Sequence, residues 1–267
     1  MASLHNMPWH TPSLDHSSDD VSGEGELFYR FPAQEDSAVE EIVGASHGRI
    51  ERVVEMVKAR PELSKAVWDW GFGDWESAIG AASHMGRTDI AQVLMDHGAR
   101  PNVFTYIMFG KLKAVKAIVD SMPGIQKMHG PHGFTMIRHA DMRLRRSDLT
   151  EQERKDVQAV KDYLIGLGDA DIGATSLAIS DEEKQVYLGK YQFGDGPDEW
   201  FEVTLNRQGN LYVSRGERIG RTLLRVEDHG FAPGGAPSVR VRFEVSENKA
   251  KNLVVYDPGV LVKAERI

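Results

Sequence analysis

The chain has 267 residues, 41% of them hydrophobic and 27% charged, and a formal net charge of -8 at pH 7. This acidic balance disfavours a broad grip on nucleic acid, which needs a basic face, and no run of about 20 apolar residues offers a membrane span. The absence of cysteine excludes disulfides, thiol nucleophiles and thiolate metal ligands. We therefore expect neither nucleic acid nor membrane as a partner.

Residues 1–31 have the composition of a flexible arm. Ser, Asp, His, Gly and Glu are mixed there without the periodicity of a helix or a strand. The opening residues, M-A-S-L-H-N-M-P-W-H, lack the basic region and the apolar run of a secretory leader. As written, the chain is expected to be cytoplasmic. The alternative is an exported or periplasmic protein whose leader has been removed.

Apolar residues recur at helical spacing between residues 32 and 172. Three of these stretches follow a single glycine, at Gly48, Gly86 and Gly110, and a fourth runs roughly from Glu151 to Leu167. Glycine readily adopts the left-handed backbone that ends one helix before the next begins. Each stretch is therefore predicted to be the second helix of an antiparallel pair.

The clearest pair spans Ser77 to Asn102 and reads S-A-I-G-A-A-S-H-M-G-R-T-D-I-A-Q-V-L-M-D-H-G-A-R-P-N. It resembles one ankyrin repeat, and Gly133–Ala140 resembles the G-x-T-P-L-H-x-A opening of another. The resemblance implies a bacterial-type ankyrin-repeat protein, with an all-α helical-repeat solenoid of about four repeats over residues 32–172. Two departures stand out. S-A-I-G replaces T-P-L-H at 77–80, and the turn glycines lie 38 residues apart from Gly48 to Gly86 but only 24 from Gly86 to Gly110.

The pattern changes near Gly173. Residues 173–182 are predicted to be a linker, and residues 183–267 alternate between apolar and polar side chains in about seven short strands. This pattern predicts a small antiparallel β-barrel or sandwich. The order Y-L-G-K-Y, E-V-T-L-N-R-Q-G-N-L-Y-V, V-R-F-E-V and A-E-R-I resembles the accessory β-domain that follows penicillin-binding-protein-like serine hydrolases. The S-x-x-K motif of those hydrolases is absent.

The segment Trp68–Glu76, W-D-W-G-F-G-D-W-E, holds three of the five tryptophans of the chain. Aromatic faces beside carboxylates are suited to sugars or cationic ligands. The alternative is structural, with Trp68 and Trp75 forming an apolar plug under the next helices. The residues predicted to bind a ligand each carry a ring: Trp68, Trp70, Phe72, Trp75, Tyr106, His132 and His139.

Histidines and carboxylates form a second group of candidates. Asp74, Glu76, His84 and His132 are candidate acid–base catalysts, because turns on one edge of the helical stack could bring them together. His129 and His132 are close in sequence, but a zinc site needs three or four converging ligands. No metal site and no cofactor are therefore predicted.

The leading functional hypothesis is a non-catalytic scaffold whose helical part and aromatic loop edge recognise a protein partner. The rival hypothesis is an enzyme or a small-molecule-binding protein for carbohydrate or aromatic ligands. Its pocket would lie between the helical stack and the β-domain and use Asp, Glu and His for acid–base chemistry. The sequence decides neither whether the chain is an enzyme nor its oligomeric state.

Overall fold

The computed structural model describes residue 30 and residues 32–173 and 175–267. The chain divides into two compact units, Met1–Glu35 and Asp36–Ile267, and the fold below is that of the second. The arm predicted at residues 1–31 lies outside the described residues except for Arg30.

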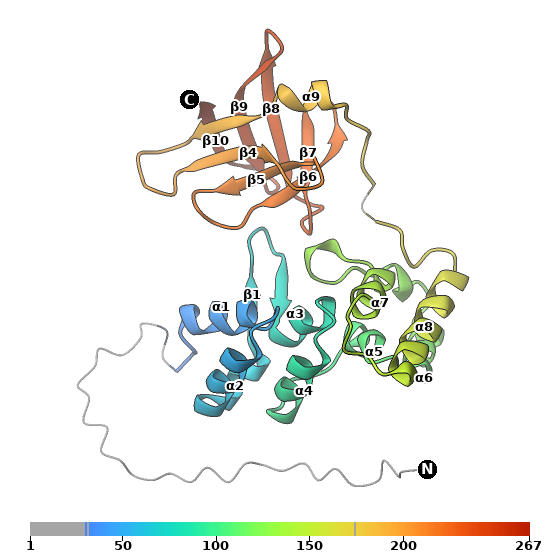
Figure 1. Ribbon diagram of the computed structural model, residues 1–267. Helices are drawn as coiled ribbons and strands as arrows, with labels where there is room; N and C mark the ends of the chain where they lie inside the picture. The colour runs from blue at the N-terminus through green and yellow to red at the C-terminus, as the bar shows by residue number, and fades with distance from the viewer. Residues whose placement is uncertain (1–29, 31, 174) are drawn as a thin grey trace, which may run out of the picture. The chain divides into compact units, whose positions relative to one another are not determined.

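Helices occupy the chain from Asp36 to Gly166, and one more precedes the strands of the second half (Figure 1). Within the described residues the α-helices are α1 (Asp36–Ala45), α2 (Ile50–Ala59), α3 (Ala78–His84), α4 (Thr88–Asp96), α5 (Val103–Met108), α6 (Leu112–Ser121), α7 (Met136–Leu144), α8 (Glu151–Gly166) and α9 (Asp181–Gln185). Short 3-10 turns lie at Pro61–Lys65, Ile125–Lys127 and Pro131–Gly133.

Successive helices pack in pairs, α1 with α2, α3 with α4, α5 with α6 and α7 with α8. Helices α2, α4, α6 and α8 lie where second helices are predicted. The glycine turn before α4 has φ +68 at Gly86, the left-handed backbone that a side chain disfavours. On α4, Ile90 and Leu94 are fully buried, so the apolar spacing does mark the inner face of the helix.

Two apolar cores hold the helical part together. The first is built mainly from α1 to α4 and includes Ile42, Val53 and Leu94. The second is built from α5 to α8 and includes Ile107, Val157 and Leu164. Separate cores explain how the spacing between turns can vary, since each group of helices fills its own interior.

A β-hairpin interrupts the helices between α2 and α3. Strands β1 (Val67–Asp69) and β2 (Trp75–Ser77) pair antiparallel, with Trp68 opposite Glu76. Its tip has positive φ at Gly71, Phe72 and Gly73, which turns the chain sharply. The hairpin is the expanded connection that the long spacing from Gly48 to Gly86 requires.

The second half of the unit is a closed antiparallel barrel (Figure 1). Its strands are β3 (Gly189–Gln192), β4 (Trp200–Leu205), β5 (Leu211–Arg215), β6 (Arg221–Glu227), β7 (Gly230–Pro233), β8 (Arg240–Ser246), β9 (Lys249–Tyr256) and β10 (Val260–Arg266). Each strand pairs with its sequence neighbour, and β10 pairs with β3 to close the barrel. The predicted β-barrel is confirmed over the alternative of a sandwich.

The predicted fold class for residues 32–172, an all-α ankyrin-like solenoid, is wrong. The chain is a mixed α and β protein, and within residues 32–172 a hairpin and 3-10 turns separate helices of 6 to 16 residues. The physical reason is that a local pattern of small residues and glycine specifies a pair of helices. It does not specify that successive pairs stack with one constant geometry.

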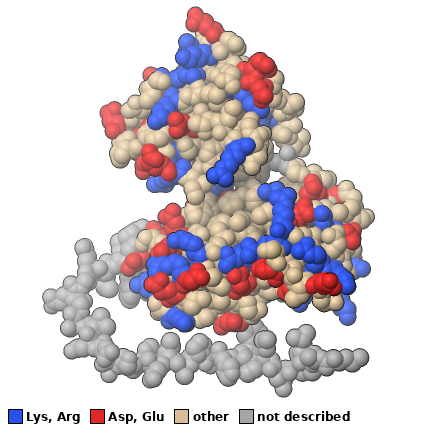
Figure 2. Space-filling model, in the orientation of Figure 1, with Lys and Arg blue, Asp and Glu red and all other residues tan. Residues whose placement is uncertain are grey.

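On the face shown in Figure 2, basic and acidic side chains are interspersed over the helical part. Among the described residues, no helix has the length and apolar character needed to cross a bilayer.

Candidate functional site

Four side chains from four separate segments converge beside the β1–β2 hairpin. They are His47 after α1, Glu76 in β2, His84 at the end of α3, and His132 in the 3-10 turn before α7. Each offers a nitrogen or a carboxylate oxygen, and these atoms all lie within 4.8 Å of one another. We refer to these four residues as the His3Glu cluster.

Two members of the cluster are presented by the same local structure. In both Ser46-His47 and Ser83-His84 the serine hydroxyl donates a hydrogen bond of 2.7 Å to a carbonyl four residues earlier, at Ile42 and Ile79. The serines are satisfied inside the helix ends. The following histidines are therefore directed out of the helix ends and toward each other, and their Nε2 atoms lie 3.2 Å apart.

The third histidine is held by a carboxylate. His132 has φ +60, a strained conformation for a residue other than glycine, in the turn between Gly130 and Gly133. Asp74 accepts hydrogen bonds from the backbone N–H of His132 at 2.9 Å and from its Nδ1 at 2.7 Å. Arg221, at the start of β6, donates to the same carboxylate. Asp74 thus fixes the ring so that Nε2 faces the cluster.

Glu76 is the centre of the cluster and is fully buried. Its Oε2 accepts a 2.7 Å hydrogen bond from Nε1 of Trp70 and lies 3.3 Å from Nε2 of His47 and 3.5 Å from Nε2 of His132. Its Oε1 lies 2.8 Å from Nε2 of His84. That contact has the length of a hydrogen bond but not the direction, so Oε1 is without a hydrogen-bond partner among the described residues.

Burial and neighbouring charges set the protonation of the cluster. Burial would raise the pKa of Glu76, but the close imidazoles of His132, His47 and His84 outweigh burial and hold that pKa well below its usual range. Burial opposes charge on His132 as well, yet its hydrogen bonds to Asp74 and Glu76 raise its pKa to about 9. Burial lowers the pKa of His84. Two carboxylates therefore face an imidazolium and a guanidinium.

The distances within the cluster fit a metal ion. Bonds of about 2.0–2.1 Å at tetrahedral angles place donor atoms about 3.3–3.4 Å apart. The observed separations of 3.2 Å between His47 and His84, 3.3 Å between His47 and Glu76, and 3.5 Å between His132 and Glu76 lie close to this value. The second ring nitrogens of His47 and His132 are also occupied, by the carbonyls of Val43 and Gly44 and by Asp74. Such outer partners orient metal-binding histidines.

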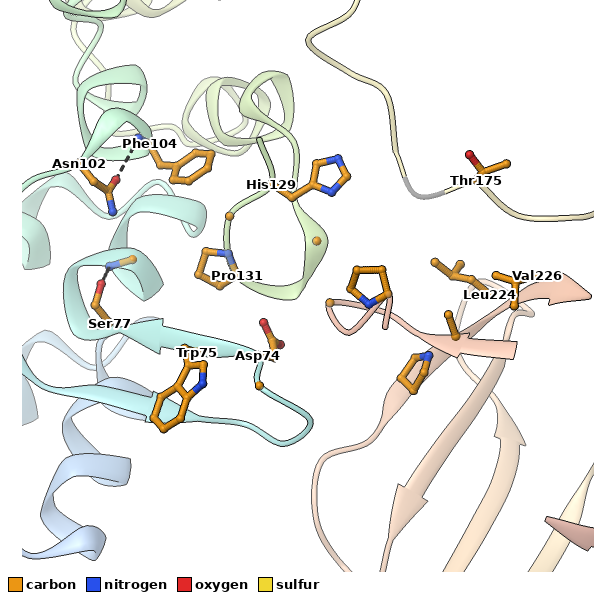
Figure 3. A pocket seen from close by; sticks show the side chains of 18 of the residues that line it. Asp74, Trp75, Ser77, Asn102, Phe104, His129, Pro131, Thr175, Leu224 and Val226 are labelled. Carbon is orange, nitrogen blue, oxygen red and sulfur yellow. Dashed lines mark hydrogen bonds between the residues drawn. The ribbon is translucent and has the colours of Figure 1, made fainter. Parts of the chain in front are cut away.

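A cavity of about 330 Å³ opens on the cluster. His47 and His132 form part of its wall, together with Trp70 and Arg221. A larger cavity of about 650 Å³ includes Asp74, next to Trp75 in Figure 3. The carboxylate oxygens of Asp74 already accept hydrogen bonds from His132 and Arg221, and His129 in this cavity bonds to the carbonyl of Ile172. The cluster therefore faces the smaller cavity, through His47 and His132.

The structure brings the four predicted acid–base candidates together, because Asp74 holds His132 and both His84 and His132 contact Glu76. The predicted aromatic residues are divided. Trp70 binds Glu76, Trp68 packs on the first helical core, and Phe72 packs against the core of the barrel. Tyr106 packs on the second helical core.

Of the two tryptophans of the apolar-plug alternative, only one is packed as that alternative requires. Trp68 is packed in the helical core as that alternative requires. The side chain of Trp75, by contrast, is 63% exposed. Neighbouring side chains of a strand point to opposite faces, so burial of Glu76 turns Trp75 outward.

His139 is near the cluster but is not part of it. Its ring stacks on Phe104 with centroids 4.3 Å apart, and its Nδ1 contacts the carbonyl of Thr135 at 2.8 Å. Nε2 has no hydrogen-bond partner in the described part of the chain. Burial lowers the pKa of His139 to about 4. The residue is a neutral, buried histidine in the core, and its predicted role in ligand binding stays a prediction.

The burial of His139 predicts that the fold is less stable in acid than at neutral pH. Because the folded pKa is below the unfolded value near 6.5, the unfolded chain binds the proton first, and stability falls as pH drops from about 6.5 toward 4. We expect His139 to account for about 2 kcal/mol of the stability lost between pH 7 and pH 4.5. Urea unfolding at both pH values should show that the free energy of unfolding differs less between pH 7 and pH 4.5 in His139→Ala than in the original chain. An unchanged difference would mean that other groups cause the acid sensitivity.

Sequence reasoning missed two residues of the site. One is His47, and the repeated Ser-His pair at the helix ends, Ser46-His47 and Ser83-His84, is the signal that could have identified it. Arg221 is 147 residues from Asp74 and has no signal in the sequence. The prediction that the chain has no metal site stays a prediction. The three or four converging ligands that a zinc site needs are nevertheless present in the His3Glu cluster.

A comparison with protein-family models, curated proteins and solved structures finds no match to this chain.

Proposed function

We propose that this protein is a metal-dependent enzyme whose His3Glu cluster holds one divalent ion next to a small-molecule substrate. The observation that carries the proposal is the convergence of three imidazoles and a buried carboxylate whose donor atoms lie within 4.8 Å of one another, with three of the separations at 3.2, 3.3 and 3.5 Å. Without an ion, the Nε2 atoms of His47 and His84 share one N–H···N hydrogen bond. The arrangement still leaves Oε1 of Glu76 without a hydrogen-bond partner among the described residues.

The donor set indicates the kind of metal. Three imidazoles and one carboxylate without thiolate suit Zn²⁺, Fe²⁺ or Mn²⁺ rather than Cu⁺. A bound ion would supply Lewis-acid chemistry, polarising a substrate oxygen or activating water. The protein's part is positional: Asp74 fixes His132, the helix end fixes His47, and Trp70 holds Glu76 through its indole N–H.

Charge balance indicates the substrate group that the site favours. A divalent ion and Arg221 together carry three positive charges, against two negative charges on Asp74 and Glu76. The excess of positive charge at the wall of the 330 Å³ cavity favours an anionic group or a developing negative charge. The rival sequence hypothesis of a small-molecule enzyme draws its support from this cavity, which helical and barrel residues line together.

The test is a metal titration of the full chain. After treatment with a chelator, the chain should take up one equivalent of Zn²⁺ with a Kd below about 1 µM, a binding free energy beyond roughly 8 kcal/mol. Its thermal midpoint should rise, because an ion that binds only the folded state stabilises it. Co²⁺ should give the visible absorption of a site with four or five ligands. Weak uptake of several equivalents, with no change in the thermal midpoint, would refute the proposal.

The scaffold hypothesis has one observation in its favour. Trp75 presents a large apolar ring to solvent, as a partner-binding residue would. Trp70 and Phe72, also predicted to contact the partner, are instead engaged with Glu76 and with the barrel core. Recognition of a protein by this edge remains a prediction, and the His3Glu cluster supports the catalytic proposal more specifically.

A further inference from the structure

A third cavity, of about 400 Å³, lies at one end of the barrel. Barrel side chains from β5, β8 and β9 form its apolar wall, among them Val213, Val241 and Val255. Phe72 at the tip of the β1–β2 hairpin packs on the barrel core and also lines this cavity. A concave, mostly apolar space of this size is typical of a small-ligand site.

The rim of this cavity is basic. Arg215, Arg218 and Arg221 are among the lining residues, and no aspartate or glutamate is. The rim is thus positively charged, although the whole chain has a net charge of -8. Arg221 is paired with Asp74, and Nε of Arg215 donates to the carbonyl of Asp198. The guanidinium of Arg218 has no hydrogen-bond or ion-pair partner within the described residues and is exposed.

We infer that the barrel end binds an amphipathic small anion. The apolar body of the ligand lies between the barrel wall and Phe72, and its single anionic group pairs with Arg218 at the rim. An apolar wall alone would accept any hydrophobic molecule, whereas a guanidinium with no partner selects one that carries a carboxylate, sulfonate or phosphate.

This cavity adjoins the one that opens on the His3Glu cluster. The two share Trp70, Ile219, Gly220 and Arg221 as wall residues. A ligand held in the barrel end therefore has one side next to the cluster, and amphipathic anions become the substrate class of the proposed enzyme. Only this link rests on the proposed function, because the binding site itself requires no metal.

The test uses two fluorescent probes of the same shape. 8-Anilinonaphthalene-1-sulfonate carries an anionic group on an aromatic body, and N-phenyl-1-naphthylamine is its uncharged counterpart. Titrated into the full chain in the presence of a chelator, the sulfonate should show saturable fluorescence enhancement and bind at least about tenfold more tightly than the amine. Equal affinity of the two probes would overturn the role of the basic rim.

Two surface variants, each with a matched control, separate the contribution of the rim charge to binding from that of the apolar wall. Arg218→Glu should weaken sulfonate binding at least about tenfold and leave amine binding within about twofold, because it reverses only the rim charge. Its control is Arg207→Glu in the exposed turn between β4 and β5, which should change neither. Leu261→Asp, in the cavity wall, should weaken both probes, and its control is the neighbouring Val260→Asp. Leu261 and Val260 are exposed to similar extents, 59% and 63%, but only Leu261 lines the cavity.

The same measurements distinguish this inference from the proposed function. His84→Ala should leave sulfonate binding unchanged while it removes metal binding. Sulfonate binding that fails in the intact chain, or that persists unchanged in both Arg218→Glu and Leu261→Asp, would overturn the inference even if the metal site is confirmed. Sulfonate binding that depends on both residues in a chain that takes up no metal would support the ligand site and refute only the enzyme proposal.

Discussion

Replacing His84 with alanine is expected to lower the affinity of the chain for Zn²⁺ by far more than 100-fold. His84 is 3% exposed, and its Nε2 lies 3.2 Å from that of His47 and 2.8 Å from Glu76, so it supplies a donor that no neighbour can replace. Loss of an outer partner of a ligand costs roughly 10–100-fold, and loss of the ligand itself costs more. Calorimetry with a competing chelator would measure the change, and the zinc-induced rise in thermal midpoint should disappear.

Two further variants give this experiment its controls. His139→Ala removes another buried imidazole, whose ring centroid lies 6.5 Å from that of His84, and should leave zinc affinity unchanged. Asp74→Asn keeps every metal-binding atom of the His3Glu cluster but weakens the hydrogen bond that orients His132. The zinc affinity should therefore fall by about 10–100-fold. If His139→Ala were as damaging as His84→Ala, the effect would come from packing, and the His3Glu cluster would not be the binding site.

Replacing Gly110 with alanine is expected to destabilise the chain by about 3 kcal/mol. Gly110 has φ +67 in the turn before α6, and an added Cβ would lie 2.7 Å from Cβ of Asp156 and 2.9 Å from the backbone nitrogen of Val157 on α8. The strain of a left-handed residue contributes about 1–2 kcal/mol, and the clash with a helix backbone contributes the rest. Chemical unfolding at neutral pH would measure the loss.

Gly168→Ala separates these two contributions. Gly168 has φ +81 but an added Cβ would meet nothing within 4 Å, so only the strain of about 1–2 kcal/mol should appear. Equal losses in the two variants would show that α8 moves aside without cost. In that case the close approach of the turn to α8 does not stabilise the second helical core.

Local elements could be predicted from the sequence, and their assembly could not. The apolar spacing after Gly86 predicts α4, and the alternating segment E-V-T-L-N-R-Q-G-N-L-Y-V predicts the strands β4 and β5. Strand β7, Gly230–Pro233, has four buried residues in succession and so lacks the alternation that identifies a strand at the surface. Barrel closure depends on β10 pairing with β3 across more than 70 residues, and no local pattern encodes that contact.

The residues of the candidate site could likewise be named from the sequence, but their convergence could not. Asp74, Glu76, His84 and His132 could be named from residue type and place in turns, which is why they appear among the predicted acid–base residues. Their convergence with His47 depends on helix ends, a hairpin and a turn that meet only in the folded chain. The ligand positions show no regular spacing, so a search for a metal motif along the sequence has nothing to recognise.

The β1–β2 hairpin joins the barrel to the chemistry of the helical part. Asp74 and Glu76 lie two residues apart, so their side chains share one face, and the first reaches Arg221 while the second reaches the His3Glu cluster. A barrel grafted from another protein would therefore have to carry a cation at the position of Arg221, or a buried carboxylate would lose a partner. The charge pair of Asp74 and Arg221 therefore couples the two halves of the fold, and they are not exchangeable modules.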